Sequence, residues 1–341
     1  MDKIRLGKTD MMVSRIGFGG IPIQLQTEDE AIGTIRRSLA LGINYFDTSD
    51  NYGTSEARIG KAIANRKNKP FVATKVGSQT KEVESHLANS RKALGVDSID
   101  VYQFHNVSDF GTLKSILAPN GALAVLQKAK KAGEIKHIGI SSHQIDVAKE
   151  AIKSGQFETI MYPFNFITCE AAEELINLAA DYDLGFIAMK PFAGGRIKNI
   201  AVAVKYLLQF PNVMVLPGIG NASQIEQIVD ILKSPQLTPE EQRIIQQTRD
   251  KMSSRICRHC DECLPCPQNV AVSYVLDFEP LSMGFPGESF YSGPMAAAMA
   301  VAATCDNCGQ CETRCPYNIP VRAMLAEYVR KFDSEKKKFL K

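Results

Sequence analysis

Residues 42–63 read GINYFDTSDNYGTSEARIGKAI and contain one strand–loop–helix unit. The apolar start of YFDTSD, residues 45–50, predicts a buried strand, and SEARIGKAIAN, residues 55–65, predicts a helix with one apolar face. Two polar residues, Asp47 and Tyr52, stand where this strand ends and its loop begins. Strands that alternate with helices form parallel sheets, so the number of such units decides the fold.

Eight such units follow one another after a short hairpin-like start. The predicted strands are residues 14–20, 45–50, 70–77, 98–106, 135–143, 159–166, 185–192 and 213–219. The predicted helices are residues 28–41, 55–65, 81–94, 121–132, 145–155, 169–182, 197–210 and 223–233. Eight units predict an α/β fold, the (β/α)8 TIM barrel, whose active site lies at the C-terminal ends of the strands. An open doubly wound sheet uses the same alternation, but it usually has fewer strands, and no G-x-G-x-x-G follows the first strand here.

The chain divides into a barrel and a smaller C-terminal region. Residues 1–237 are assigned to the barrel. Residues 238–254 form a connecting helix, with Thr238 as its N-cap and Pro239 at its first position. A cysteine-rich domain, mostly helical and ferredoxin-like, is expected over residues 255–325. Residues 326–341 form a basic tail, which is either a solvated end or a docking patch.

The composition describes a globular protein without a strong charge bias. Of its 341 residues, 45% are hydrophobic, and the formal net charge is +3. This charge gives no reason to expect nucleic acid or a membrane as a partner. The start, MDKIRLGKTD, lacks the apolar stretch of a signal peptide, and the longest apolar run, residues 295–303, is about half of the roughly 20 residues that a membrane span needs. A cytoplasmic location is therefore expected.

The nine cysteines are unevenly placed, because eight lie between Cys257 and Cys315 and only Cys169 lies in the barrel region. Without a secretory signal, such clustering indicates metal ligation in a reducing cytosol rather than disulfides. The second run, CDNCGQCETRCP, has the C-x2-C-x2-C-x3-C-P spacing of bacterial ferredoxins, and the first, CRHCDECLPCP, has one residue fewer in its last gap. The expected groups are two [4Fe–4S] clusters, and structural zinc is the alternative.

The spacing also suggests how the cysteines are shared. In two-cluster ferredoxins the fourth cysteine of each run binds the other cluster. The same exchange assigns one cluster here to Cys257, Cys260, Cys263 and Cys315. It assigns the other to Cys305, Cys308, Cys311 and Cys266. The shortened gap before Cys266 leaves the place of this residue open.

Four polar residues stand near the ends of three consecutive strands: Asp47, Tyr52, Lys75 and His105. A lysine inside the apolar strand FVATKVG needs a partner, and Asp47 on the neighbouring strand is available. Lys75 beside Tyr52 is expected to lower the pKa of the phenol, which then exchanges a proton with a carbonyl oxygen. His105 is expected to donate a hydrogen bond to the same oxygen. Each residue alone fits a structural role, but the four together indicate a catalytic site.

Five stretches make the chain similar to the aldo/keto reductase superfamily: LGKTDMMVSRIGFGG, GINYFDTSDNYGTSEARIGKAI, SIDVYQFHN, GEIKHIGISSH and GFIAMKPFAGG. The resemblance spans roughly residues 3–232, and the cysteine runs place the chain with members that carry a C-terminal ferredoxin-like 4Fe–4S domain. It implies a barrel fold and a catalytic tetrad of Asp47, Tyr52, Lys75 and His105. The implied reaction moves a hydride between C4 of NADP or NAD and a carbonyl or alcohol, with Tyr52 as acid or base.

The resemblance also implies where the nicotinamide lies. Gly20 and Ile21 border it, and Ser141 and Ser142 reach its carboxamide. Met189 takes the position of an aromatic residue that commonly stacks on the ring, and it supplies soft contact area instead. Another methionine, Met161, takes the position of a glutamine that commonly holds the carboxamide.

The phosphates are expected on the neighbouring loops. Lys190 either lies near the pyrophosphate, where Gly194 and Gly195 permit close backbone approach, or forms a structural ion pair. The loop LPGIGNASQIEQIV resembles the family's adenosine-phosphate loop, but Gly218 and Gln224 replace the lysine and arginine that often grip the 2′-phosphate of NADP. Backbone N–H groups near Gly218, Gly220 and Asn221 can still bind phosphate. The choice between NADP and NAD therefore stays open.

The sequence thus predicts an oxidoreductase that acts on a small carbonyl or alcohol and carries iron–sulfur clusters. A hydride carries two electrons and a cluster normally exchanges one, so the clusters are structural or redox-sensing, serve one-electron chemistry, or work with a further cofactor. A redox partner protein remains an option. The alternative is an electron-transfer or redox-sensing protein whose barrel binds nucleotide without turnover.

Overall fold

The computed structural model describes residues 1–77 and 82–340. The chain opens with an antiparallel hairpin of β1 (Lys3–Arg5) and β2 (Met12–Ser14). The main sheet contains β3 (Phe18–Gly19), β4 (Tyr45–Asp47), β5 (Phe71–Gly77), β6 (Ile99–His105), β7 (Ile135–Ser141), β8 (Thr159–Pro163), β9 (Gly185–Met189) and β10 (Val213–Leu216). Each of these eight strands falls within one of the predicted strand ranges.

The main sheet closes into a barrel. Neighbouring strands are parallel, and their order in the sheet is their order in the sequence. Parallel bridges from Ile16 to Val215 and from Gly19 to Gly218 join the first strand to the last. The sequential order and the closure confirm the (β/α)8 barrel and exclude a doubly wound sheet, in which the strand order reverses.

Successive residues of each strand pack alternately into the barrel interior and into the core between the strands and the helices. Tyr45 and Ile187 point into the barrel interior, whereas their neighbours Phe46 and Phe186 pack against the surrounding helices. This division follows from the pleat, which sends successive side chains to opposite faces of a sheet. Because both faces are buried, the strands read as nearly continuous apolar runs. The polar residues at their ends are therefore exceptions that need a reason.

The barrel helices are α1 (Glu28–Ala40), α2 (Ser55–Ile63), α3 (Val83–Leu94), α4 (Phe110–Leu117), α5 (Ala122–Lys131), α6 (Ile145–Lys153), α7 (Glu170–Glu174), α8 (Ile176–Asp181), α9 (Ile200–Leu208) and α10 (Ala222–Ile231). Two 3-10 turns, η1 (Pro22–Leu25) and η2 (Ala193–Gly195), follow β3 and β9. The sequence did not predict α4, which begins at an Asp109 side chain that accepts from Thr112 N at 2.7 Å. The helix predicted over 169–182 is split at Leu175, and the first residue of the helix predicted over 81–94, Lys81, lies outside the described residues.

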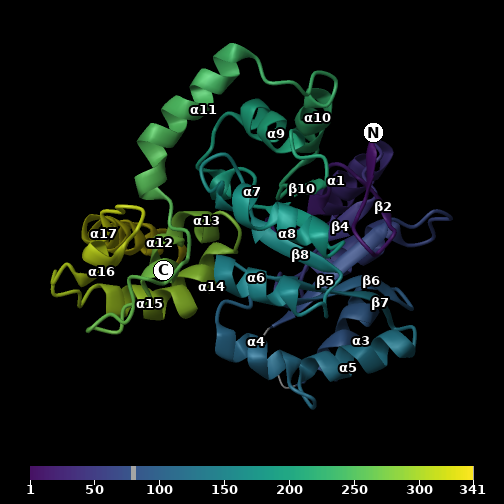
Figure 1. Cartoon of the computed structure of the whole chain (residues 1–341), viewed down its shortest axis with the longest axis horizontal. Coiled ribbons are helices and arrows are strands. Elements are labelled where there is room, and N and C mark those ends of the chain that lie inside the picture. Colours follow the sequence, from purple (N-terminus) through teal and green to yellow (C-terminus); the bar gives the residue numbers. More distant parts are fainter. Residues whose placement is uncertain (78–81, 341) are drawn as a thin grey trace.

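Helix α11 (Pro239–Met252) leads from the barrel to a helical module (Figure 1). As predicted, Thr238 caps it, in a capping box with Glu241. The module contains η3 (Ser253–Arg255), α12 (Val272–Leu276), α13 (Phe278–Ser282), α14 (Gly287–Ser292), α15 (Pro294–Ala302), α16 (Gln310–Arg314) and α17 (Val321–Phe339). It has its own apolar core, with Phe278, Tyr328 and Phe332 at its centre.

The end of the chain, for which either a solvated end or a docking patch was expected, is helical up to Phe339. Helix α17 runs through the predicted boundary at residue 325 and continues to Phe339, while Lys341 lies outside the described residues. Phe332 is 3% exposed and anchors the second half of this helix to the module core. Within the part of the chain that the structure describes, no helix combines the length and apolar character that a membrane crossing requires.

Candidate functional site

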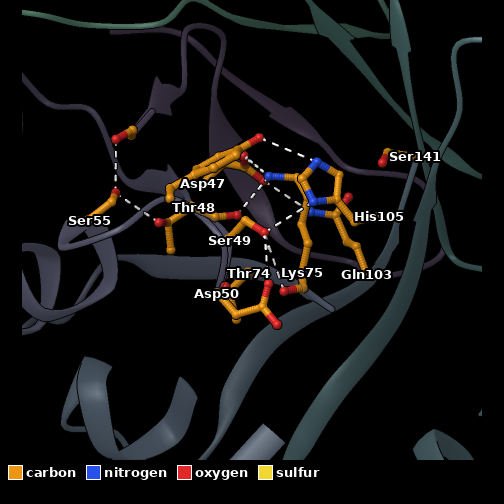
Figure 2. A network of polar contacts seen from close by, with 12 residues as sticks. Asp47, Thr48, Ser49, Asp50, Ser55, Thr74, Lys75, Gln103, His105 and Ser141 are labelled. Carbon is orange, nitrogen blue, oxygen red and sulfur yellow. Dashed lines mark hydrogen bonds and ion pairs between the residues drawn. The ribbon is translucent and has the colours of Figure 1, made fainter. Parts of the chain in front are cut away.

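Three consecutive strands bring the four predicted catalytic residues to one end of the barrel. Asp47 ends β4, Lys75 lies in β5 and His105 ends β6 (Figure 2). Tyr52 stands in the loop between β4 and α2. The Lys75 ammonium donates to Asp47 Oδ1 and, at 2.7 Å, to the Thr48 carbonyl. Both side chains of the ion pair are nearly sealed, at 2% exposure for Lys75 and 4% for Asp47. This is the pairing that the sequence predicted.

A further residue, Gln103, completes the surroundings of Asp47. Its Nε2 donates to Asp47 Oδ2 at 3.0 Å, so both carboxylate oxygens have a donor. Gln103 pairs with Lys75 in the register of β5 and β6 and lies two residues before His105. Residues two apart on a strand share a face. The sequence analysis missed Gln103, although this spacing from His105 indicated its position.

Tyr52 lies between the ion pair and the histidine. Its hydroxyl is 3.5 Å from His105 Nε2, and Lys75 Nζ is 5.0 Å from the centre of its ring. Burial raises the pKa of the Tyr52 phenol above its ordinary value, and the Lys75 ammonium lowers it by less. The expectation of a lowered tyrosine pKa was therefore wrong, because desolvation of the phenolate outweighs the nearby cation. Tyr52 is held as a neutral phenol, which is a proton donor.

His105 is held as a neutral imidazole. Burial, assisted by the Lys75 charge, lowers its pKa to about 3. Its Nδ1 lies 3.1 Å from the hydroxyl of Ser49, which the sequence analysis did not single out (Figure 2). A neutral imidazole carries one proton, so the hydrogen bond at Nδ1 governs whether Nε2 donates or accepts. Ser49 is thus a positioning residue for His105.

The low pKa of His105 makes stability depend on pH. The unfolded imidazole takes up a proton near pH 6.5 and the folded one only near pH 3, so the unfolded state binds more protons in between. We expect His105 to reduce the free energy of unfolding by up to about 1.4 kcal/mol per pH unit as the pH falls from 6.5 towards 3. Urea unfolding of the wild type and of His105→Gln at pH 5 and 7.5 measures this contribution. Equal pH dependence in the two proteins contradicts the assignment.

The residues expected around the nicotinamide are present, but their polar groups have partners within the protein. Ser141 Oγ accepts from Asn106 N at 2.9 Å, and Ser142 Oγ donates to the Gln144 carbonyl at 3.0 Å. Both serines are at most 1% exposed. Met161 is buried in the interior core of the barrel, and the partly buried Met189 packs against the same core.

The residues expected near the pyrophosphate contact the C-terminal module instead of open space. Lys190 Nζ donates to Asp277 Oδ2 at 2.8 Å, so this lysine forms an ion pair with the C-terminal module. Gly194 has φ +64°, and a Cβ built on it would lie 2.4 Å from Pro280. A glycine is therefore required where α13 meets the loop after β9.

Residues of the loop after β10 cap the start of helix α10. The Asn221 side chain caps α10 by accepting from Gln224 N at 3.0 Å. Gln224 in turn accepts from Gly220 N at 2.7 Å through its Oε1. Gly218 stands opposite Gly19 in the bridge that closes the barrel, and it is exposed. The N–H group of Gly220, which was expected to bind phosphate, is thus directed at a side-chain oxygen, and so is the N–H group of Gln224.

The cysteines gather from both runs. A hollow in the module is lined by Cys263, Cys266, Cys305, Cys308 and Cys311. Burial raises the pKa of the Cys260 thiol, and the charge of Cys315 adds to this rise. The hollow thus brings Cys263 and Cys266 of the first run beside three cysteines of the second, and the exchange of Cys266 and Cys315 stays a prediction. Cys169 stands apart, packed against the barrel core.

The two runs share one backbone pattern that the sequence analysis missed. Left-handed residues occur two and four positions after the first cysteine of each run: His259 and Asp261 after Cys257, and Asn307 and Gly309 after Cys305. An asparagine of the same conformation, Asn269 or Asn318, stands three positions after each last cysteine. Alternating left-handed residues turn N–H groups inward, as in many iron–sulfur sites. The repeat CPQNVAV and CPYNIPV was its visible sequence signal.

No single metal ion is accommodated by these side chains as they stand. Among residues 1–77 and 82–340, no group of three or more His, Cys, Asp or Glu side chains surrounds a common point at ligating distance.

The barrel is similar in sequence to proteins of a known family. The family model described as "Aldo/keto reductase family" matches residues 15–200. The L-galactose dehydrogenase of Arabidopsis thaliana is 30% identical over 210 residues, which cover 56% of this chain and 65% of the relative. The uncharacterised oxidoreductase YqkF of Bacillus subtilis is 29% identical over 210 residues, covering 57% and 66%. The chain thus spans about two thirds of the length of these two relatives.

Solved structures agree with this match. The holo form of the aldo-keto reductase AKR11C1 from Bacillus halodurans superposes with a TM-score of 0.62 at 26% identity, over 72% of this chain and 96% of that one. An aldo-keto reductase from Klebsiella pneumoniae in complex with NADPH has the same TM-score at 17% identity, over 73% of this chain and 95% of that one, and shows the shared fold.

Proposed function

Because the chain belongs to the aldo/keto reductase family, we propose that it is an oxidoreductase that uses NADP or NAD to reduce a small carbonyl compound or oxidise the alcohol. The observation that carries this proposal is the convergence of Asp47, Tyr52, Lys75 and His105 at one end of the barrel. Relatives in this family act on small carbonyl substrates, and NADPH is bound in the Klebsiella structure. A reducing cytoplasm suits the eight clustered thiols.

In the proposed reaction the protein supplies the proton and the orientation. When bound, the nicotinamide supplies the hydride to the carbonyl carbon. The neutral Tyr52 phenol gives its proton to the carbonyl oxygen, and Lys75 stabilises the phenolate that remains. In the tautomer that this reaction requires, His105 Nδ1 accepts from the Ser49 hydroxyl 3.1 Å away, and Nε2 donates to the same oxygen and fixes its position. The product is an alcohol with one added hydride and one added proton.

The proposed function is tested by measuring nucleotide-dependent reduction of carbonyl compounds. Purified protein is mixed with a panel of aldehydes and ketones and either NADPH or NADH, and oxidation of the nucleotide is followed together with alcohol formation. We expect reduction of at least one member with one of the two nucleotides. Absence of turnover across the panel, with nucleotide bound, favours the second candidate below.

We also propose that residues 255–325 form a ferredoxin-like domain, distinct from the barrel at residues 1–237, that holds two [4Fe–4S] clusters. One is assigned to Cys257, Cys260, Cys263 and Cys315, and the other to Cys305, Cys308, Cys311 and Cys266. The hollow that brings Cys266 beside Cys305, Cys308 and Cys311, and that Cys263 also lines, supports the second set, and the repeated left-handed turns support both. Such clusters supply one-electron redox capacity when bound.

Iron content tests the ligand assignment. After anaerobic reconstitution the wild type is expected to hold about eight iron atoms per chain, and Cys311→Ser about four, since one cluster loses a ligand. Cys169→Ser, outside both runs, is the matched control and should keep the full content. A colourless protein with stoichiometric zinc, or equal iron in wild type and Cys311→Ser, contradicts the assignment.

A second candidate function rests on the contacts of the proposed nucleotide site. Lys190 is paired with Asp277, and the hydroxyl groups of Ser141 and Ser142 have partners inside the protein. With these groups engaged, a bound nicotinamide lacks the contacts expected to orient it for hydride transfer, as in an electron-transfer or redox-sensing protein whose barrel binds nucleotide without turnover. Nucleotide binding with electron transfer to the clusters, but without alcohol formation, is the outcome specific to this candidate.

A further inference from the structure

Residues 277–284, here called the covering segment, belong to the C-terminal module and lie on the barrel. The segment contains α13 and contacts the loop after β9 through Pro280 on Gly194 and Met283 on Gly195. At its other end, the Gly284 carbonyl accepts from Gln24 at 2.8 Å, and a Cβ built on Gly284 would lie 3.4 Å from Ile21. The covering segment therefore reaches from the end of β9 to the end of β3.

These contact points are the ones assigned to the dinucleotide. Strand β10 lies between β9 and β3 in the closed barrel, so the covering segment passes over the end of β10. Ile21 was expected at the nicotinamide, and Lys190 and Gly194 at the pyrophosphate. A segment that already touches both ends of this path leaves a dinucleotide no room to make the same contacts.

Asp277 fixes the covering segment electrostatically. Its carboxylate lies 2.8 Å from Lys190 Nζ, 3.0 Å from His259 Nε2 and 3.8 Å from Arg196, and it is 9% exposed. Burial alone would raise the pKa of Asp277, but Lys190 and His259 outweigh burial and hold it well below its ordinary value. Asp277 is therefore an anion, and it is paired with Lys190, the lysine that was expected to contact the pyrophosphate.

The first cysteine run also contacts Asp277, through His259, and contacts the barrel. His259 lies between Cys257 and Cys260, and its ring is 5.2 Å from that of His143, which follows β7. The next residue, Gln144, donates to the Cys260 carbonyl at 2.7 Å. The first cysteine run therefore contacts both the barrel and Asp277. Asp277, the first residue of the covering segment, is thus held by His259 and Arg196 as well as by Lys190.

We propose that the covering segment is an internal competitor of the dinucleotide, in which the Asp277 carboxylate occupies Lys190 in place of the pyrophosphate. This inference rests on the proposed function and adds its regulation. Nucleotide binding requires the Asp277–Lys190 pair to break and residues 277–284 to leave the strand ends. The affinity for nucleotide is then set by the module as well as by the barrel.

The test is nucleotide affinity in matched charge variants. Titration of NADPH and NADH, followed by nucleotide fluorescence, is expected to give at least about tenfold tighter binding in Asp277→Asn than in the wild type. Glu279→Gln is the control, because it removes the same charge from the covering segment, and Glu279 pairs with Lys331 and Arg196 but not with Lys190. In a Lys190→Met background, Asp277→Asn should no longer tighten binding.

Hydrogen exchange of the wild type provides a measurement that does not depend on the variants folding. Saturation with the nucleotide is expected to speed amide exchange in residues 277–284, because the segment loses its contacts. Unchanged or weaker affinity in Asp277→Asn, or slower exchange in the segment with nucleotide bound, overturns the inference while leaving the proposed function in place. If neither nucleotide binds the wild type or Asp277→Asn, the proposed function fails, and the inference fails with it.

Discussion

Replacing Tyr52 with phenylalanine is expected to lower kcat for carbonyl reduction by about 10²- to 10⁴-fold, the usual contribution of a general acid. In the proposed reaction the phenol is the proton donor, and it is kept neutral by burial and lies beside His105 and Lys75. Phenylalanine keeps the ring and its packing and removes only the hydroxyl. The affinity for the nucleotide should therefore stay unchanged, and the loss should appear in kcat.

Steady-state kinetics with the best substrate of the panel, together with a nucleotide titration, measures both quantities. Tyr182→Phe is the control, since Tyr182 is 40% exposed on the barrel surface and outside the site. Turnover of Tyr52→Phe at the wild-type rate would remove Tyr52 from its assigned role and return the proton transfer to another group.

The second large effect concerns Lys75. Lys75→Met is expected to lower the free energy of unfolding by about 3–5 kcal/mol, because it leaves the buried Asp47 carboxylate without its cation. Gln103 remains as a donor to Asp47 Oδ2 but carries no charge. The same change should abolish turnover, because the phenolate of Tyr52 loses the ammonium that stabilises it.

A double variant separates charge from packing. In Asp47→Asn/Lys75→Met both charges are gone, so the chain should recover a large part of the stability lost in Lys75→Met alone. Urea unfolding of the wild type, both single variants and the double variant completes the cycle. A double variant whose loss equals the sum of the single losses would show that the two side chains do not interact as a buried pair.

The barrel could be predicted from sequence because its signals are local and repeated. Each strand is a short apolar run and each helix an apolar stripe, and eight repeats leave few alternatives. Asp47, Lys75 and His105 were recognisable because charged or polar groups are exceptional inside buried strands. Thr238 and Pro239 marked the start of α11 by a local capping rule.

What the sequence could not supply depends on distance and on burial. The Lys190–Asp277 pair joins residues 87 positions apart, and no local pattern connects them. The pKa of Tyr52 was assigned the wrong direction because the cation beside it was visible in the sequence and the depth of burial was not. The repeat CPQN and CPYN, by contrast, was visible and indicated that the two cysteine runs fold alike.

The central claim is hydride transfer at the Tyr52 site, and isotope transfer tests it most directly. The holoprotein is incubated with a carbonyl substrate and with nucleotide that carries deuterium at C4 of the reduced nicotinamide, and the alcohol is examined by mass spectrometry and NMR. We predict one deuterium at the former carbonyl carbon, formed in the wild type and suppressed in Tyr52→Phe. Alcohol without deuterium, or labelled alcohol formed equally well by Tyr52→Phe, would contradict the account.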